Sequence, residues 1–358
     1  MKTNRTNADI FAKSNAIFLL SPLLAVVLMN CVTSAAELHG VMNQGLLTLS
    51  WDVPEAKLEE ARGPLGPWQT VLATNSPYQF RPSTNLASRC GFYRLKMPAP
   101  GKKWLTVAAV TMTSQTNTTG NLQTLYSYME QAASNRADLV VFPEMALQGC
   151  PGWRENNVAP TPGEMAYIQA TAETIPGAST SNVVAKARDL DLFVVFGMTE
   201  KDQTNLYNAN VFLGPDGVIG KHRKTYFVGN DALIWRLGAG YQVLDSPIGK
   251  IGLMICAEMY SGWNFPGPVL AAQGADLLVT SSAWWTSAAY GWDLCTVTNA
   301  VLSRRWHVVS QQVGTVGHAQ CYGHSRVVDP LGRIVCDSGA SQGMVIWATD
   351  RVTDIRNP

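Results

Sequence analysis

In the stretch GKIGLMICAEMYSGW, residues 249–263, an apolar strand ends at a cysteine. Residues 251–255 have the composition of a buried strand, and polar, glycine-containing chain follows Cys256 at once. A cysteine within such a run usually packs as a small hydrophobe. Placed where the strand stops, Cys256 is instead expected at the mouth of a cleft.

Two further strand ends carry chemically active side chains. LVVFPEM (139–145) places Glu144 just past one apolar run, and GVIGKHRKTYF (217–227) places Lys224 just past another. Taken singly, each of these residues reads as a solvated loop residue. A thiol nucleophile, however, needs a base, and a developing oxyanion needs a cation or N–H donors. Sites of α/β proteins form at strand ends, so the three residues together favour a thiol-dependent site.

The chain from residue 104 onward alternates apolar strands with helices. Strands are expected at 104–112, 137–145, 192–200, 207–222, 242–256 and 276–284, helices at 121–135, 180–191 and 265–275, and a hairpin at 322–335. Continuous Val, Leu and Ile runs between helices indicate a sheet buried beneath a helical layer. The sequence therefore predicts a layered α/β fold.

Over about residues 104–350 the chain resembles the nitrilase superfamily of carbon–nitrogen hydrolases. The resemblance rests on pieces that occur in the family's order and spacing: VAAVTM, ADLVVFPEMALQG, AETIPGAST, VVFGMTEKD, LYNANVFLGPDGVIGKHRKTYF, IGLMICAEM, AAQGADLLVTSSAW and YGHSRVVDPLGRIVCDSG. It implies a four-layer α-β-β-α sandwich that assembles into homodimers or larger homo-oligomers. It also implies an enzyme that acts on a small molecule without a metal or organic cofactor.

The resemblance further implies a Glu–Lys–Cys triad, which falls on Glu144, Lys224 and Cys256. Lys224 is chosen over Lys221 because the family's catalytic lysine directly follows an arginine. Glu144 would take the thiol proton from Cys256. Lys224 and the backbone N–H of Ala257 would face the negative charge that develops on the substrate.

Two departures from the family pattern bear on the substrate. Family members usually carry a second glutamate between the lysine and the cysteine, but residues 225–255 contain none, and Asp231 is the best-placed substitute for positioning the lysine. True nitrilases tend to have tryptophan after the cysteine, where Ala257 stands here; Glu258 fits the acidic residue of many amidases. An amide or N-carbamoyl substrate is therefore favoured over a nitrile.

Other residues and functions enter as alternatives. Trp284, after a strand, is a candidate wall of the substrate pocket, although aromatic residues at strand ends often belong to the core. His222 and His307 have no evident partner and are expected to be neutral and satisfied. The rival functions are a nitrilase, a thioester-based N-acyltransferase and a secreted binding protein with a decayed hydrolase scaffold.

Charge and composition exclude some classes of partner. The 358 residues include 27 basic and 26 acidic side chains and form no long basic run, which argues against nucleic acid or an anionic membrane as the main partner. No Cys/His cluster has the spacing of a zinc site. The composition is that of an ordinary globular protein.

The N-terminus predicts three segments: a signal peptide at 1–36, a small β-sandwich-like module with a linker at 37–100, and the hydrolase domain at 101–358. Basic residues, an apolar run at 16–29 and small residues before Glu37 are typical of a secretory signal, so a secreted or periplasmic location is expected. Lipidation at Cys31 is disfavoured by the preceding Asn30. The partner of the β module is unknown.

Six cysteines follow the predicted signal peptide and are scattered along the chain. Cys321 and Cys336 flank the predicted hairpin, which could bring them within reach of a disulfide. Spacing alone leaves the pairing open.

Overall fold

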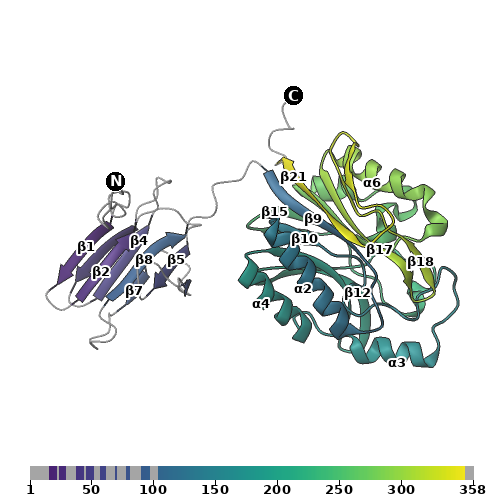
Figure 1. The fold of residues 1–358 in the computed structure, drawn as a ribbon, viewed down its shortest axis with the longest axis horizontal. Coiled ribbons are helices and arrows are strands. Elements are labelled where there is room, and N and C mark those ends of the chain that lie inside the picture. Colours follow the sequence, from purple (N-terminus) through teal and green to yellow (C-terminus); the bar gives the residue numbers. More distant parts are fainter. Residues whose placement is uncertain are drawn as a thin grey trace, which may run out of the picture. The chain divides into compact units, whose positions relative to one another are not determined.

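The computed structural model describes the backbone of residues 104–350 and of strands between Ala16 and Lys96 (Figure 1). Side-chain surroundings are described for 48–50 and for 105–349 except Trp263. The chain divides into two compact units, Met1–Lys102 and Lys103–Pro358. Within the described residues, no helix is long and apolar enough to cross a membrane.

The described elements of the first unit are all strands. They form one sheet in the order β1–β2–β8–β5–β6 and another in the order β3–β4–β7. The bounds are β1 Ala16–Ser21, β2 Leu24–Met29, β3 Leu38–Asn43, β4 Leu46–Trp51, β5 Lys57–Ala61, β6 Gln69–Thr70, β7 Tyr78–Phe80 and β8 Cys90–Lys96.

The predicted signal peptide overlaps the first of these strands. The apolar run expected in the signal forms the antiparallel pair of β1 and β2, and β2 also pairs with β8. The cleavage position before Glu37, Cys31 and the predicted boundary between residues 100 and 101 lie outside the described residues. The signal peptide and the segment boundaries built on it stay predictions.

The second unit is organised by one long sheet that folds over on itself. Its order is β13–β12–β11–β10–β9–β17–β16–β15–β14, and β21 pairs with the free side of β9. The first half comprises β9 Trp104–Met112, β10 Leu139–Val141, β11 Phe193–Asp202, β12 Asn205–Gly214, β13 Gly217–Arg223 and β21 Gly343–Asp350. The second half comprises β14 Val243–Ser246, β15 Gly249–Ile255, β16 Leu277–Ser282, β17 Trp306–Val316, β18 Ala319–Tyr322, β19 Arg326–Val328 and β20 Ile334–Asp337.

The two halves of the sheet meet face to face through alternating side chains. Val107 and Ala109 of β9 pack in one apolar cluster with Leu253 of β15 and Val279 of β16. Because side chains on a strand alternate between faces, Ala108 and Val110 pack outward, onto the helices of the first half. Among the described strands, the halves join edge to edge where Thr111 and Met112, at the end of β9, pair with Gln311 and Gln312 in the middle of β17.

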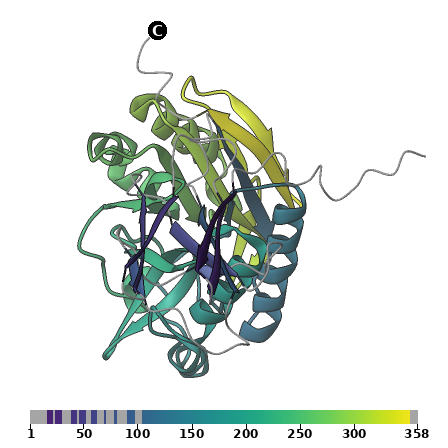
Figure 2. The same ribbon diagram turned by 90° about the vertical axis from the view of Figure 1, so that its left-hand side faces the viewer.

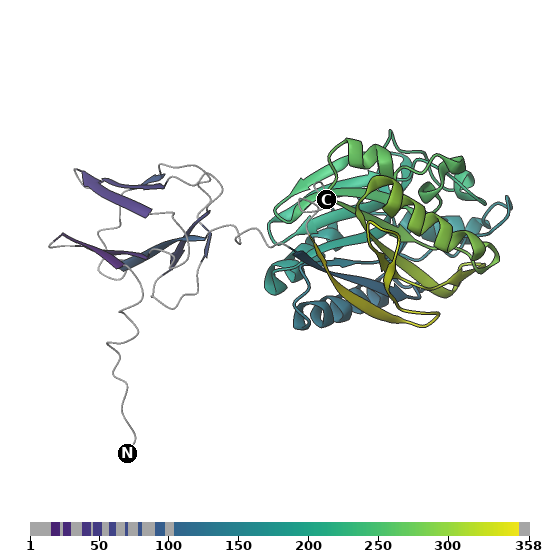
Figure 3. The ribbon, with the colours of Figure 1, turned by 90° about the horizontal axis from the view of Figure 1, so that it is seen from above.

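Helices cover both outer faces. Helices α2 (Thr118–Ser134) and α4 (Ala178–Leu190) pack on the first half, and α5 (Gly267–Ala272) and α6 (Tyr290–Ser303) pack on the second. Figures 2 and 3 show the strands between these two helical layers. The order of layers is the predicted α-β-β-α sandwich. Helix α3 (Pro162–Thr171), which the sequence analysis did not predict, begins in a capping box of Thr161 and Glu164.

The ends of several strands come together at one edge of the sandwich. Strand β10 is parallel to both of its neighbours, β9 and β11. Strands β15, β16, β17 and β9 are also parallel, each to the next in that order. In this register Ile255 lies beside Ser281, and Ser282 beside Gln311. The residues that follow β10, β15 and β16 are Phe142, Cys256 and Ala283, so this edge carries the predicted site.

Candidate active site

Glu144 follows β10, in a turn that leaves the sheet. Met145 in this turn has a φ of +55°, in the left-handed region. Gly197 of β11 passes so close that a Cβ atom there would lie 2.6 Å from the Cα of Glu144, so the strand needs a glycine at this point. From the second half of the sheet, the Gln312 side chain donates to the carbonyl of Glu144 at 2.9 Å.

The Glu144 carboxylate is fully buried and accepts hydrogen bonds on both oxygens. Oε1 accepts from Asn208 Nδ2 at 2.7 Å and from Lys224 Nζ at 2.9 Å, and Oε2 accepts from the backbone N–H of Ala283 at 3.0 Å. Burial raises the pKa of Glu144, Lys224 partly offsets this, and the charge of Asp231 raises it further. Glu144 is therefore a better base than an exposed carboxylate.

Lys224 follows β13, and its buried ammonium lies between two carboxylates. Nζ is 2.9 Å from Glu144 Oε1 and 2.8 Å from Asp231 Oδ2. Burial acts to lower the pKa of Lys224, but the charges of Asp231 and Glu144 hold it well above its usual value. An ammonium has three donors, so these two bonds leave one for a substrate. Lys221, the lysine passed over in the sequence analysis, pairs with Glu200 instead.

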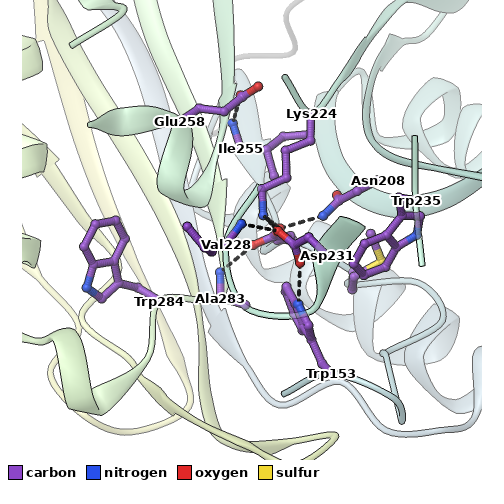
Figure 4. Close-up of polar contacts among 12 residues, drawn as sticks. Trp153, Asn208, Lys224, Val228, Asp231, Trp235, Ile255, Glu258, Ala283 and Trp284 are labelled. Carbon is purple, nitrogen blue, oxygen red and sulfur yellow. Dashed lines mark hydrogen bonds and ion pairs between the residues drawn. The ribbon is translucent and has the colours of Figure 1, made fainter. Parts of the chain in front are cut away.

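Asp231 occupies the place expected for a group that positions Lys224. It begins a short 3₁₀ helix, η2 (Asp231–Leu233), and is fully buried. Its Oδ1 accepts from Trp153 Nε1 at 2.9 Å, and its Oδ2 accepts from Lys224 and from the backbone N–H of Val228 at 3.2 Å. Figure 4 shows Lys224, Trp153 and Val228 converging on this carboxylate.

Cys256 is the first residue past β15. It has a φ of +49°, a value that residues other than glycine seldom adopt and that clusters at functional sites. Its side chain is 5% exposed. Burial and the charge of Glu144 raise the pKa of the Cys256 thiol to about 12, with Lys224 acting in the opposite direction. At neutral pH the thiol is therefore protonated, and a base would be required for it to act as a nucleophile.

Ala257 and Trp284 lie beside Cys256. Ala257 belongs to a 3₁₀ helix, η3 (Cys256–Met259), and the first N–H groups of such a helix have no acceptor within it. Trp284 packs in the same apolar cluster as Cys256 and Ala257. Its indole N–H donates to the carbonyl of Ala288 at 2.8 Å, and Figure 4 shows the ring away from the carboxylates. Trp284 is buried in this cluster, and its role as a wall of the substrate pocket stays a prediction.

Glu258 does not point toward Lys224 and Cys256 but bridges the two halves of the sheet. It accepts hydrogen bonds from His222 Nε2 at 2.8 Å, from Thr225 Oγ1 at 2.6 Å and from the backbone N–H of Ile255 at 2.6 Å. The sequence analysis gave His222 no evident partner, and this was wrong, because the partner lies 36 residues away. His307 bonds to Thr280 and to the carbonyl of Thr296.

The sequence analysis did not predict four residues that form hydrogen bonds with Glu144 or Asp231: Trp153, Asn208, Ala283 and Gln312. Asn208 could have been noticed, because it is one of two asparagines, with Asn210, in the largely apolar strand YNANVFL. Ala283 acts through its backbone, which residue type does not reveal.

The described residues were also compared with the arrangements needed for a metal site and for a disulfide. Among residues 105–349, no group of His, Cys, Asp or Glu side chains is arranged to hold a metal ion. Cys321 and Cys336 are free thiols, so the disulfide considered for them is not formed. The reason is topological: Cys336 belongs to the β19–β20 hairpin, whereas Cys321 lies on β18, which pairs with β17.

Comparison with solved structures places the fold. A member of branch 10 of the nitrilase superfamily from Saccharomyces cerevisiae superposes with a TM-score of 0.60 at 24% identity, covering 71% of this chain and 93% of that chain. The likeness shows a common fold.

Comparison of sequences places the family. The carbon–nitrogen hydrolase family signature matches residues 106–356. A probable nitrilase of Schizosaccharomyces pombe is 27% identical over 60% of this chain and 76% of that protein. An omega-amidase of Mus musculus is 27% identical over 66% of this chain and 86% of that protein. An aliphatic nitrilase of Sinorhizobium fredii is 34% identical over 37% of this chain and 46% of that protein. The chain therefore belongs to the carbon–nitrogen hydrolase family of the nitrilase superfamily, and it is a carbon–nitrogen hydrolase.

Proposed function

We propose that this enzyme hydrolyses an amide or N-carbamoyl bond of a small molecule through a thioester on Cys256. The observation that carries the proposal is the buried ammonium of Lys224, hydrogen-bonded to Glu144 and Asp231, at the sheet edge where Cys256 follows β15. This arrangement brings together a base, a cation and a thiol.

In the first step the Cys256 sulfur attacks the substrate carbonyl carbon while Glu144 takes the thiol proton. The raised pKa of Glu144 suits it to this task. Negative charge then develops on the carbonyl oxygen, where the third N–H of Lys224 and the backbone N–H of Ala257 can donate. The carbon–nitrogen bond breaks, the nitrogen receives the proton from Glu144, and ammonia or an amine leaves.

In the second step water replaces the amine. Glu144, again a carboxylate, takes a proton from the water as its oxygen attacks the thioester carbon. The carbon–sulfur bond breaks, the proton returns to the sulfur, and the acid leaves. Every proton in both steps passes through Glu144.

An amide is preferred to a nitrile because of the residue beside the nucleophile. Ala257 stands where true nitrilases tend to have tryptophan, and Glu258 matches the acidic residue of many amidases. One relative is named an omega-amidase and others are named nitrilases, so the nitrile remains the alternative for the test to decide.

The proposal includes a homo-oligomer and a location outside the cytoplasm. Helix α6 exposes the apolar side chains of Tyr290, Leu294 and Leu302, by 86%, 46% and 56%, and a second copy of the chain would cover them. The composition of residues 1–36 supports secretion. Light scattering of the purified protein and N-terminal sequencing of the protein from its native host test these two parts.

The activity is tested by ammonia release across a panel of amides, N-carbamoyl compounds and nitriles. Cys256→Ala should abolish release, whereas Cys336→Ala, a thiol on β20 outside the site, should leave it unchanged. Mass spectrometry of the quenched reaction should show an acyl group on Cys256. Release from nitriles alone would assign a nitrilase. Transfer of the acyl group to an added amine, in preference to water, would assign an acyltransferase.

A further inference from the structure

Glu258 is a second buried carboxylate, and it joins the two halves of the sheet beside the site. From the first half it accepts hydrogen bonds from His222 Nε2 at 2.8 Å, from Thr225 Oγ1 at 2.6 Å and from the backbone N–H of Thr225. From the second half it accepts the backbone N–H of Ile255 at 2.6 Å. We call Glu258, His222, Thr225 and Ile255 the Glu258 clamp.

The Glu258 clamp holds the chain neighbours of two reacting groups. Thr225 directly follows Lys224, and Ile255 directly precedes Cys256. Consecutive Cα atoms are about 3.8 Å apart, so a shift at the clamp is passed to the lysine and to the nucleophile. The two groups stand on different halves of the sheet, and the clamp links those halves at this point.

The charges around Glu258 suit a fixed link. Burial acts to raise the pKa of Glu258, but the charge and hydrogen bond of His222 and the hydrogen bonds of Thr225 bring it below its usual value. As an ionised carboxylate it accepts from all its donors at once. The Tyr241 ring stacks on His222 at 5.8 Å and keeps the imidazole in place.

We propose that the Glu258 clamp sets the separation between Lys224 and Cys256, so that Glu258 and His222 are positioning residues of the reaction. This inference rests on the proposed function, in which both groups act on the same carbonyl. The oxyanion must reach the lysine while its carbon is bonded to the sulfur. An error of about 1 Å in such an arrangement can cost roughly 100-fold in rate.

Four variants test the clamp in the full-length protein. Glu258→Gln removes the charge at constant size. Thr225→Val removes the Oγ1 donor, whereas Thr225→Ser keeps a hydroxyl donor; neither alters the charge. Asp329→Asn is the matched control, because Asp329 is also a buried carboxylate that accepts backbone N–H groups, but it lies in the β19–β20 turn, next to the strand end opposite the site.

The kinetic readout separates positioning from general damage. We expect kcat to fall roughly 10- to 100-fold in Glu258→Gln and roughly 10-fold in Thr225→Val, with KM within about threefold of the unmodified enzyme. Thr225→Ser and Asp329→Asn should keep kcat. Combining Glu258→Gln with Thr225→Val should cost less than the product of the two single losses, because both act on one contact.

Hydrogen exchange provides a readout that needs no substrate, so a failure of the proposed function can be told apart from a failure of the clamp. Thr225→Val changes a side chain on the first half, yet the clamp predicts that the Ile255 amide on the second half exchanges faster, whereas Thr225→Ser leaves it protected. Unchanged Ile255 protection in Thr225→Val would overturn the clamp, as would a kcat for Glu258→Gln equal to that of Asp329→Asn. If Glu258→Gln does not fold, the two Thr225 variants decide the question.

Discussion

Glu144 and Glu258 are both fully buried carboxylates beside the same sheet edge, yet their surroundings push them in opposite directions. Glu144 shares the Lys224 ammonium with Asp231, so two negative charges compete for one positive charge and its pKa is raised by burial and by Asp231. Glu258 receives only donors, and its pKa is lowered by His222 and Thr225. The comparison shows that burial alone does not make a carboxylate a good base. The nearby charge of Asp231 raises the pKa of Glu144, and no such carboxylate raises the pKa of Glu258.

The largest expected effect comes from making Glu144 neutral. Glu144→Gln should lower kcat by at least about 1000-fold, because the proton of Cys256 loses its acceptor. Its folding stability at pH 7 should stay level or rise. A carboxyl whose pKa is raised by folding weakens the fold at a pH above that pKa, and this penalty disappears in the variant. Ammonia release and urea unfolding measure the two effects.

Glu258→Gln should show the opposite pattern in the same urea experiment. It removes an ionised group that the fold stabilises, so the free energy of unfolding should drop by roughly 1–3 kcal/mol. Equal loss of stability in the Glu144 and Glu258 variants would contradict the distinction between the two carboxylates.

The next effect comes from removing the competing charge near Glu144. Asp231→Asn should lower kcat roughly 10- to 100-fold, because Lys224 loses one of its two partners. It should also lower the pKa of Glu144, since the charge of Asp231 raises that pKa. The acid limb of the kcat/KM profile should therefore move to lower pH. An acid limb that stays in place or moves to higher pH would show that the charge of Asp231 does not raise the pKa of Glu144.

A smaller effect is expected from acid. Because the pKa of Glu258 is lower in the folded state, its contribution to stability is complete above the unfolded value of about 4.3 and is lost as pH falls through the folded value. Thermal unfolding between pH 3 and 7 should show a shallower acid loss for Glu258→Gln than for the unmodified enzyme. Parallel curves would argue against an ionised Glu258.

The smallest effect is expected from an ion pair far from both carboxylates. Lys186 of α4 pairs with the exposed Glu130 of α2. Lys186→Ala should change the free energy of unfolding by less than about 1 kcal/mol and leave kcat unchanged, because exposed pairs contribute little. A large loss of activity here would mean that general destabilisation inactivates the enzyme. The activities of the Glu144 and Glu258 variants would then not report on the separate roles of the two carboxylates.

The strands that precede Glu144 and Cys256 could be predicted because LVV and IGLMI are apolar runs. The strand before Lys224, GVIGKHR, is apolar only in its first half. Helix α6, with the sequence YGWDLCTVTNAVLS, could not be predicted, because its aromatic and β-branched residues favour strands locally. The burial of Trp292 and Cys295 in the core stabilises it as a helix.

The environment of the candidate site was less predictable than its residues. Asp231 could be singled out because it is one of two acidic residues between Lys224 and Cys256. The pair of His222 and Glu258 joins segments that come together only when the sheet folds over on itself. Local sequence has no information on such distant contacts.

The contact of Glu144 with Ala283 and Gln312 has a consequence for synthesis of the protein. Ribosomes make the chain from its N-terminus, so Glu144, Lys224 and Cys256 are all present in the nascent polypeptide before the residues that hold Glu144 from the other half of the sheet. A nascent chain that stops short of Gln312 has the whole triad but lacks this support for its base. Catalytic competence should therefore appear late in translation, well after the nucleophile has left the ribosome.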